Sequence, residues 1–201
     1  SIDRKSVVFR KEVIDLMCRS GIFNNLGVPD NQVLLQDVYE ECKVVYEYEK
    51  NIILKLLGNM CIAIEHVGST SVKGMVAKPI IDIAVGVHDL NILKKIPAIM
   101  INGGYHHLSE HGDNDRLLFI KKKQGKCFLH IHVEIYQGES WENHLLFKEY
   151  LQKNLKALSE YNRLKKDLAA RFSDDRKQYT SGKADFIQSC LGEIRNIQYI
   201  K

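Results

Sequence analysis

The stretch EHVGSTSVKGMVAKPIIDIAVGV, residues 65–87, decides the fold of this chain. It links two apolar, β-branched runs that predict strands at about residues 61–67 and 79–87. The turn between them begins at Gly68 and continues with three hydroxyl residues, Ser69, Thr70 and Ser71. The second run carries a single carboxylate, Asp82, near its centre. Because a buried acid is unfavourable without a partner, the turn and the acid together indicate a functional site.

The sequence on the N-terminal side of this stretch predicts one long amphipathic helix. Apolar residues recur at three- and four-residue steps over residues 34–57, and Gly58 provides a stop. Residues 1–33 are set apart as an N-terminal extension, in which an apolar patch at residues 13–17 is compatible with a short helix. We therefore expect residues 34–201 to form the main domain.

The sequence on the C-terminal side predicts helices and one hairpin. Asp89 caps a helical segment that Pro97 breaks or kinks and that ends at residues 103–104. The run RLLFIKKKQGKCFLHIHVEIY, residues 116–136, predicts a hairpin with KKQGK at its tip. Helical periodicity then returns at about residues 140–153, 155–172 and 182–198. This order predicts an α+β fold, in which a mixed sheet has flanking helices and a helical C-terminal region.

The composition narrows the class of protein. The 201 residues carry a formal net charge of +4, which suits a phosphorylated small ligand better than a dedicated nucleic-acid partner. The five cysteines are scattered without a CxxC pair, which favours reduced thiols in a cytosolic protein. No apolar stretch approaches the roughly 18 residues that span a bilayer. We therefore expect a cytoplasmic protein with no membrane partner.

The alternation of side chains along strands gathers the polar candidates on one face of the sheet. Asp82 shares its face with Ala84, whereas the alternate residues of this strand are apolar and form the face that belongs to the core: Ile81, Ile83, Val85 and Val87. In the second strand of the hairpin, the polar face carries His130, His132 and Glu134. If these strands are neighbours, Asp82, His132 and Glu134 converge, and the two carboxylates need a cation between them. Oxygen ligands suit Mg²⁺ or Mn²⁺, so we expect one of these ions there.

The turn and three basic residues supply groups suited to phosphate oxygens. Gly68 permits tight backbone geometry, and the hydroxyls and amides of residues 69–71 can donate hydrogen bonds. The ammonium of Lys78 can neutralise phosphate charge, and Arg116 at the start of the hairpin can pair with a further phosphate. Lys183, in YTSGKADFI, lies near a predicted helix N-terminus and can close over a phosphate.

Simpler explanations stay open for each candidate. Asp82 could be a strand acid bonded to the nearby turn, and Glu134 could lie on a half-exposed face of the sheet. An alternating histidine pair is often a solvated strand face, and Arg116 could be an exposed charge on an edge strand. The aromatic residues of the helical C-terminal third fit a hydrophobic core without any role in a site.

The segment HVGSTSVKGMVAKPIIDI closely resembles the signature of the GrpB family, which belongs to the DNA polymerase beta-like nucleotidyltransferase superfamily. The resemblance covers roughly residues 35–195 and extends in order to HIHVEIY, WENHLLFKEYL, YNRLKKDLAARF and YTSGKADFI. It implies a nucleotidyltransferase-like mixed sheet. It also implies metal-dependent transfer of a nucleoside monophosphate from a nucleoside triphosphate to an acceptor.

The superfamily pattern places Gly-Ser before one acid and a second acid two positions later. Gly68 and Ser69 fit, Asp82 matches the first acid, and Glu134 would be the acid from a neighbouring strand. Ala84 stands at the second position, where it offers no metal ligand. The resemblance therefore leaves a second possibility, a non-catalytic module that binds a nucleotide or a CoA-like ligand. A purely structural or partner-binding role of the helical third is a third alternative, although it leaves the polar face of the sheet unexplained.

Overall fold

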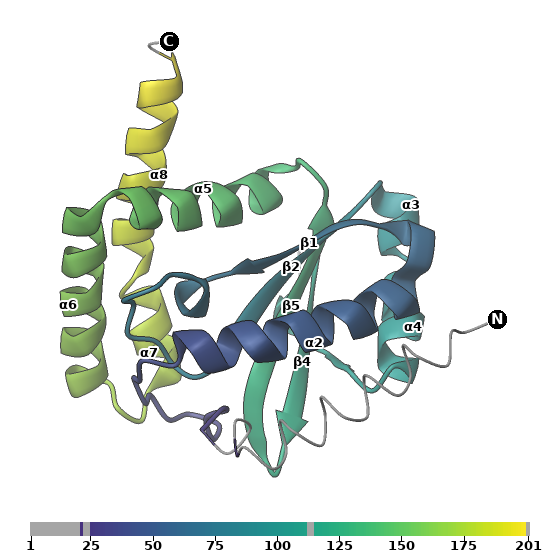
Figure 1. Ribbon diagram of the computed structural model, residues 1–201, viewed down its shortest axis with the longest axis horizontal. Helices are drawn as coiled ribbons and strands as arrows, with labels where there is room; N and C mark the ends of the chain where they lie inside the picture. The colour runs from purple at the N-terminus through teal and green to yellow at the C-terminus, as the bar shows by residue number, and fades with distance from the viewer. Residues whose placement is uncertain (1–20, 22–24, 112–114, 200–201) are drawn as a thin grey trace.

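The computed structural model describes residues 21, 25–111 and 115–199, and these residues form an α+β fold (Figure 1). The apolar patch noted at residues 13–17 lies outside them. Within the described residues the centre is a mixed sheet in the order β1-β2-β5-β4-β3. Its strands are β1 (Cys61–Val67), β2 (Ile81–Val87), β3 (His106–His107), β4 (Arg116–Lys123) and β5 (Lys126–Ile135). The predicted fold class, a mixed sheet with flanking helices and a helical C-terminal region, is confirmed.

The two strands expected to carry the polar face are neighbours. β2 pairs with β5 in parallel, whereas β1 pairs with β2 and β4 with β5 in antiparallel fashion. The register places three residue pairs side by side on the polar face: Asp82 with His130, Ala84 with His132, and Gly86 with Glu134. Residues paired in register share one face of a sheet, so the predicted alignment of the polar faces is confirmed.

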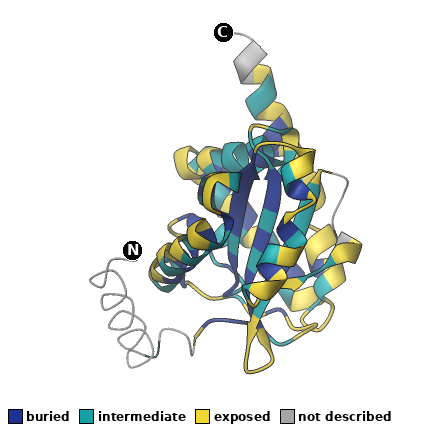
Figure 2. Cartoon of the chain, turned by 90° about the vertical axis from the view of Figure 1, so that its right-hand side faces the viewer, coloured by how far each residue is buried: buried dark blue, intermediate teal, exposed yellow. Residues whose placement is uncertain are grey.

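Three helices cover the apolar face of the sheet: α2 (Tyr39–Leu57), α3 (Leu90–Leu93) and α4 (Ile96–Asn102). Figure 1 shows α2 lying across the sheet, and Figure 2 shows the central strands largely buried. The main core joins apolar residues of α2 and α4 to those of β2 and β5, among them Val45, Ile53, Met100, Ile83 and Ile131. This packing leaves the opposite, polar face of β2 and β5 for the C-terminal region.

The helical C-terminal region consists of α5 (Glu139–Lys153), α6 (Leu155–Arg171), α7 (Arg176–Ser181) and α8 (Ala184–Tyr199). Trp141 of α5 belongs to a buried cluster with Val67 and Ala84, which brings α5 to the polar face of β2. A further cluster joins α5 and α6 to the segment that follows Gly68: Val72, Met75, Leu151, Ala157 and Tyr161. The hydroxyl-rich turn is therefore fixed against α6.

Most predicted elements are confirmed, with shifts where local contacts intervene. The helix predicted over residues 34–57 begins at Tyr39, because Gln36 instead pairs with Ala77 in an isolated bridge. Pro97 does break the next helical segment, which divides into α3 and α4. The short helix α7 has no counterpart in the hydrophobic periodicity, since six residues are too few to show a period.

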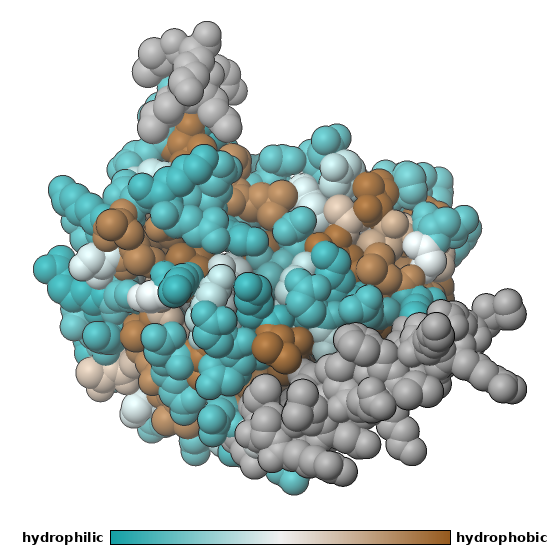
Figure 3. Space-filling view, in the orientation of Figure 1, coloured by the Kyte–Doolittle hydropathy of each residue, from teal (hydrophilic) through white to brown (hydrophobic). Residues whose placement is uncertain are grey.

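In the view of Figure 3, the described hydrophobic residues lie in separate groups among polar ones. Among the described helices, none combines the length and the apolar character needed to cross a bilayer. The described part of residues 1–33 contacts the sheet, because Val28 is buried and bridges Cys127 of β5.

Candidate functional site

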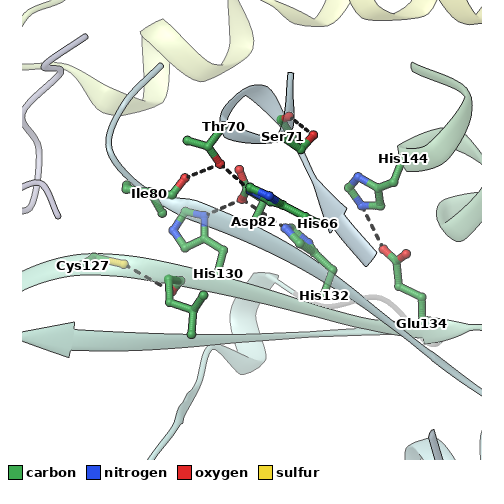
Figure 4. A network of polar contacts seen from close by, with 12 residues as sticks. His66, Thr70, Ser71, Ile80, Asp82, Cys127, His130, His132, Glu134 and His144 are labelled. Carbon is green, nitrogen blue, oxygen red and sulfur yellow. Dashed lines mark hydrogen bonds and ion pairs between the residues drawn. The ribbon is translucent and has the colours of Figure 1, made fainter. Parts of the chain in front are cut away.

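The centre of the candidate site is Asp82, held between two histidines of the neighbouring strand (Figure 4). His130 Nδ1 lies 3.1 Å from Asp82 Oδ1, and His132 Nε2 lies 3.4 Å from the same oxygen. Burial by itself disfavours the charged form of Asp82, but the hydrogen bonds from both imidazoles outweigh it and hold the pKa well below its usual range. Asp82 is therefore an ionised carboxylate whose Oδ1 already accepts from both rings.

Arg176 of α7 defines the protonation of His130. An Arg176 guanidinium nitrogen lies 3.0 Å from His130 Nε2, and a guanidinium can only donate. His130 Nε2 must then accept, so the ring proton sits on Nδ1 and is donated to Asp82. Burial lowers the pKa of His130, while bonds to Asp82 and Cys127 outweigh it and raise the pKa to about 9. A protonated ring would turn a second N–H toward Arg176, so the Arg176 contact favours the neutral ring and opposes the rise in the pKa that Asp82 and Cys127 produce.

Gly68 brings the hydroxyl-rich turn directly onto Asp82. Its backbone has φ 69° and ψ −171°, a conformation that is essentially restricted to glycine. A Cβ at this position would lie 2.5 Å from Asp82 Oδ2. The missing side chain of Gly68 thus makes room for the Asp82 carboxylate.

The three hydroxyls of the turn have different partners. Ser71 Oγ donates to the Gly68 carbonyl at 2.7 Å, and Thr70 Oγ1 donates to the Ile80 carbonyl at 3.4 Å. Thr70 Oγ1 also accepts from His66 Nε2 at 3.0 Å. Both hydroxyls are buried and hold the turn against the strands. Ser69 differs, because its Oγ accepts from the Lys165 ammonium at 3.3 Å.

Among the described residues, four cationic side chains gather near Asp82: Lys78, Lys165, Arg176 and Lys183. The ammonium groups of Lys78 and Lys183 lie 5.1 Å and 4.8 Å from the ring centre of Tyr179. Burial, followed by repulsion from Arg176 and Lys183, lowers the pKa of Lys78 to about 7. Burial and the charge of Lys183 lower the pKa of Lys165 to about 6. Burial is the larger cause of both shifts and the neighbouring cations add to it, so these lysines lose their protons readily unless an anion lies nearby.

Glu134 belongs to a separate group of ligand atoms. It is fully buried, and its Oε1 accepts from His144 Nε2 of α5 at 3.2 Å. Its Oε2 has no hydrogen-bond partner among the described residues. One ligand atom each of His132, Glu134 and His144 lie within 4.8 Å of one another. Figure 4 shows Glu134 directed toward His144. His132 belongs both to this group and to the group around Asp82.

The other predicted phosphate ligands take different positions. Lys78 and Lys183 join the cations near Asp82. Arg116 of β4 lies in register with Glu134, four residues along β5 from His130. It is therefore placed beside the Glu134 group rather than beside the turn.

Three residues of the site are absent from the sequence-based candidates: His144, Lys165 and Arg176. Lys165 could have been recognised from the sequence, because it occupies a position on the apolar face of α6, four residues after Tyr161 and three before Leu168. A buried lysine at such a position indicates a polar partner. Arg176 lies on the short helix α7, and its approach to His130 depends on tertiary packing alone.

Comparison with known proteins identifies relatives over most of the chain. A family model described as GrpB protein matches residues 32–193. The glutamate-rich protein GrpB of Alkalihalophilus pseudofirmus is 36% identical over 84% of this chain and 99% of that protein. The UPF0157 protein YqkA of Bacillus subtilis is 34% identical over 78% of this chain, but this match spans only 45% of YqkA.

A solved structure of a GrpB protein shows the same relationship. The crystal structure of the conserved protein GrpB from Enterococcus faecalis is similar with a TM-score of 0.70 and 30% identity, over 82% of this chain and 96% of that chain. A structure of the RNA terminal uridylyl transferase Cid1 is similar with a TM-score of 0.48 and 11% identity, over 81% of this chain and 45% of that one. Similarity as low as the latter supports no conclusion about activity.

Proposed function

The chain belongs to the GrpB family, and from that membership we propose that it binds a nucleoside triphosphate and transfers the nucleotidyl group to an acceptor. The phosphates would lie at the turn of Gly68 and Ser69, and the reacting phosphorus would lie near Asp82. A related phosphorylated small molecule is an alternative occupant of the same site.

The observation that carries this proposal is that several cationic side chains surround the single carboxylate of Asp82. Lys78, Lys165 and Lys183 all have lowered pKa values because burial, and the other cations nearby, disfavour their charged forms. Bringing like charges together is unfavourable unless an anion compensates them. A triphosphate carries several negative charges, so its binding would restore the balance and keep the lysines protonated.

Each residue has a separate role in this proposal. Ser69, bonded to Lys165, would donate its hydroxyl proton to a phosphate oxygen, and Lys78 and Lys183 would offset the charge that develops on the phosphates. Gly68 allows the backbone to approach the ligand closely. Thr70 and Ser71 would fix the shape of the turn, since their hydroxyls are already bonded to backbone carbonyls.

The residues near Asp82 fit one divalent cation better than two. Asp82 is an ionised carboxylate, but Ala84 offers no ligand and the adjacent groups are the imidazoles of His130 and His132. Because both imidazoles donate to Asp82, the ion would be held by the Asp82 carboxylate and by phosphate oxygens, a ligand set that suits Mg²⁺ or Mn²⁺. When bound, such an ion would withdraw charge from the phosphate oxygens.

A second candidate function is nucleotide or CoA binding without chemistry. Two observations favour it: Ala84 stands where the superfamily has its second acid, and Asp82 Oδ1 is already occupied by two imidazoles. Binding relies on the cations and the turn, which do not depend on Ala84. The two functions therefore predict the same binding and differ only in turnover.

Titration calorimetry with ATP and the other nucleoside triphosphates, with and without Mn²⁺ or Mg²⁺, tests binding. Lys165→Met should weaken the affinity by about 10- to 100-fold, the value of a charge-assisted hydrogen bond. The matched control is Lys166→Met, which removes an exposed lysine from the next position of α6. Asp82→Asn should remove the metal dependence, and Asp167→Asn on the exposed face of α6 is its control.

Two results would overturn the proposal. One is the absence of binding at millimolar concentrations of every nucleotide tried. The other is an equal affinity of Lys165→Met and Lys166→Met. Release of pyrophosphate in the presence of candidate acceptors then separates a transferase from a binding module.

A further inference from the structure

We propose that His132, Glu134 and His144 form a binding site for a divalent transition-metal ion of the Zn²⁺ class. This site lies beside Asp82 but is separate from the proposed nucleotide site, and its occupation does not depend on nucleotide binding. Its ligands come from the polar face of β5 and from the first half of α5.

The ligand atoms are already close together. One atom each from His132, Glu134 and His144 lie within 4.8 Å of one another. In a tetrahedral site, two ligands that each lie about 2.1 Å from a zinc ion are about 3.4 Å apart, so the widest pair must close by up to about 1.4 Å. His144 can supply this movement, because its side chain is 27% exposed and sits on a helix surface.

The second observation is the unpaired oxygen of Glu134. The Glu134 side chain is fully buried, and a buried carboxylate costs free energy unless its oxygens have partners. The bond from His144 accounts for Oε1. Oε2 has no hydrogen-bond partner among the described residues, so a simple Glu134–His144 pair leaves half of the carboxylate unsatisfied. A cation between the three side chains would satisfy it.

The residues around His132 and Glu134 would also support metal binding. The carboxylate of Asp82 lies 3.4 Å from His132 Nε2, and a carboxylate behind an imidazole orients the ring. Trp141 and Tyr136 pack over Gly86, the residue beside Glu134 on β2, and form an apolar wall next to the group. A low dielectric strengthens the attraction between a buried carboxylate and a metal ion.

The chemistry of the ligands selects the metal. Two imidazole nitrogens and one carboxylate suit Zn²⁺, Co²⁺ or Mn²⁺, whereas Mg²⁺ prefers an oxygen shell. Three protein ligands leave a fourth position open for water or for a group of a substrate. The sheet therefore presents two adjacent groups of different preference, one for phosphate near Asp82 and one for a transition metal near Glu134.

The test uses the whole protein, freed of metal by chelation, without nucleotide. Zn²⁺ binding is measured by calorimetry and by elemental analysis after dialysis, and Co²⁺ binding by its visible absorption bands. Co²⁺ should also quench the fluorescence of Trp141, the single tryptophan of the chain, which precedes His144 by three residues on α5. We expect one ion per chain, with no competition from Mg²⁺.

His144→Ala is the decisive variant, because alanine favours a helix and the position is partly exposed. It should weaken Zn²⁺ binding by at least about 100-fold, since loss of an outer-shell partner alone costs about 10- to 100-fold. His106→Ala, which removes an exposed histidine on β3, is the control for nonspecific binding and should bind as the wild type does. Circular dichroism checks that both variants are folded.

Three results would overturn the proposal: no Zn²⁺ retained by the wild type, equal affinities of His144→Ala and wild type, or equal losses in His144→Ala and His106→Ala. Asp82→Asn separates this site from the proposed nucleotide site. It should weaken Zn²⁺ binding by no more than about 10- to 100-fold, the effect of an outer-shell partner and less than that of His144→Ala, while it impairs nucleotide binding. If Asp82→Asn abolishes Zn²⁺ binding and His144→Ala does not, the ion belongs to the Asp82 group and the assignment is wrong.

Discussion

Gly68→Ala should destabilise the protein by more than its strained backbone alone explains. The backbone of Gly68 has φ 69° and ψ −171°, and a non-glycine residue in this region costs about 1–3 kcal/mol. The new Cβ would also lie 2.5 Å from Asp82 Oδ2 and 2.9 Å from Asp82 Cβ. Relieving such an overlap in a packed region costs a further 1–3 kcal/mol or so. The expected loss is about 2–6 kcal/mol.

A matched glycine separates the two contributions. Gly125, at the hairpin tip, has φ 76°, and a Cβ there would have no atom within 4 Å. Gly125→Ala therefore measures conformational strain alone, expected to be about 1–2 kcal/mol. The excess in Gly68→Ala, about 1–3 kcal/mol, belongs to the contact with Asp82.

Urea denaturation followed by circular dichroism measures both losses, provided that the slopes with urea are equal. The double variant Gly68→Ala/Asp82→Ala lacks Oδ2 and Cγ, two of the three atoms nearest to the new Cβ. It should recover about 1 kcal/mol or more relative to the sum of the single variants. Equal losses in Gly68→Ala and Gly125→Ala, together with additivity in the double variant, would refute the close packing of Gly68 on Asp82.

Two further predictions concern buried Lys165 and the ion pair of Lys121 with Glu49. Burial lowers the pKa of Lys165 in the folded protein to about 6, whereas its ordinary value is 10.5. Between these two pH values the unfolded chain binds more protons than the folded one, so the free energy of unfolding should rise with pH. Lys165→Met should flatten this rise in urea denaturation between pH 6 and about 10. Lys121→Met removes the ammonium bonded to buried Glu49 at 2.8 Å and should cost about 3 kcal/mol in the same assay. Lys122→Met, which breaks an exposed ion pair, should cost less than about 1 kcal/mol, and equal costs would contradict this assignment.

The sheet could be predicted from sequence because its signals are local. The β-branched runs around Asp82, the turn of Gly68 and the hairpin tip each depend on neighbouring residues, and β1, β2, β4 and β5 lie close to the expected ranges. The placement of β2 beside β5 was expected from one further condition, that two polar faces should meet, whereas the parallel direction of the pair was not predicted.

The grouping within the site could not be predicted in the same way. Alternation puts His130, His132 and Glu134 on one face but does not say which of them lies beside Asp82. That depends on the register of the parallel pair of β2 with β5, which places His130 there. Arg176 lies 46 residues after His130, and His144, ten residues after Glu134, contacts it from the helix that follows β5, so neither contact leaves a local pattern.

The position of Ala84 gains a physical meaning from its neighbours. Ala84 lies in register with His132 of β5 and belongs to a buried apolar cluster with Trp141. An acid at position 84 would be buried beside Asp82 and would need a second cation. This chain places its positive charge elsewhere, in lysines and an arginine held by α6, α7 and the loops beside them. Those side chains can compensate phosphate charge with fewer metal ions, so the missing acid is compatible with strong binding of a polyphosphate and bears chiefly on the rate of any transfer.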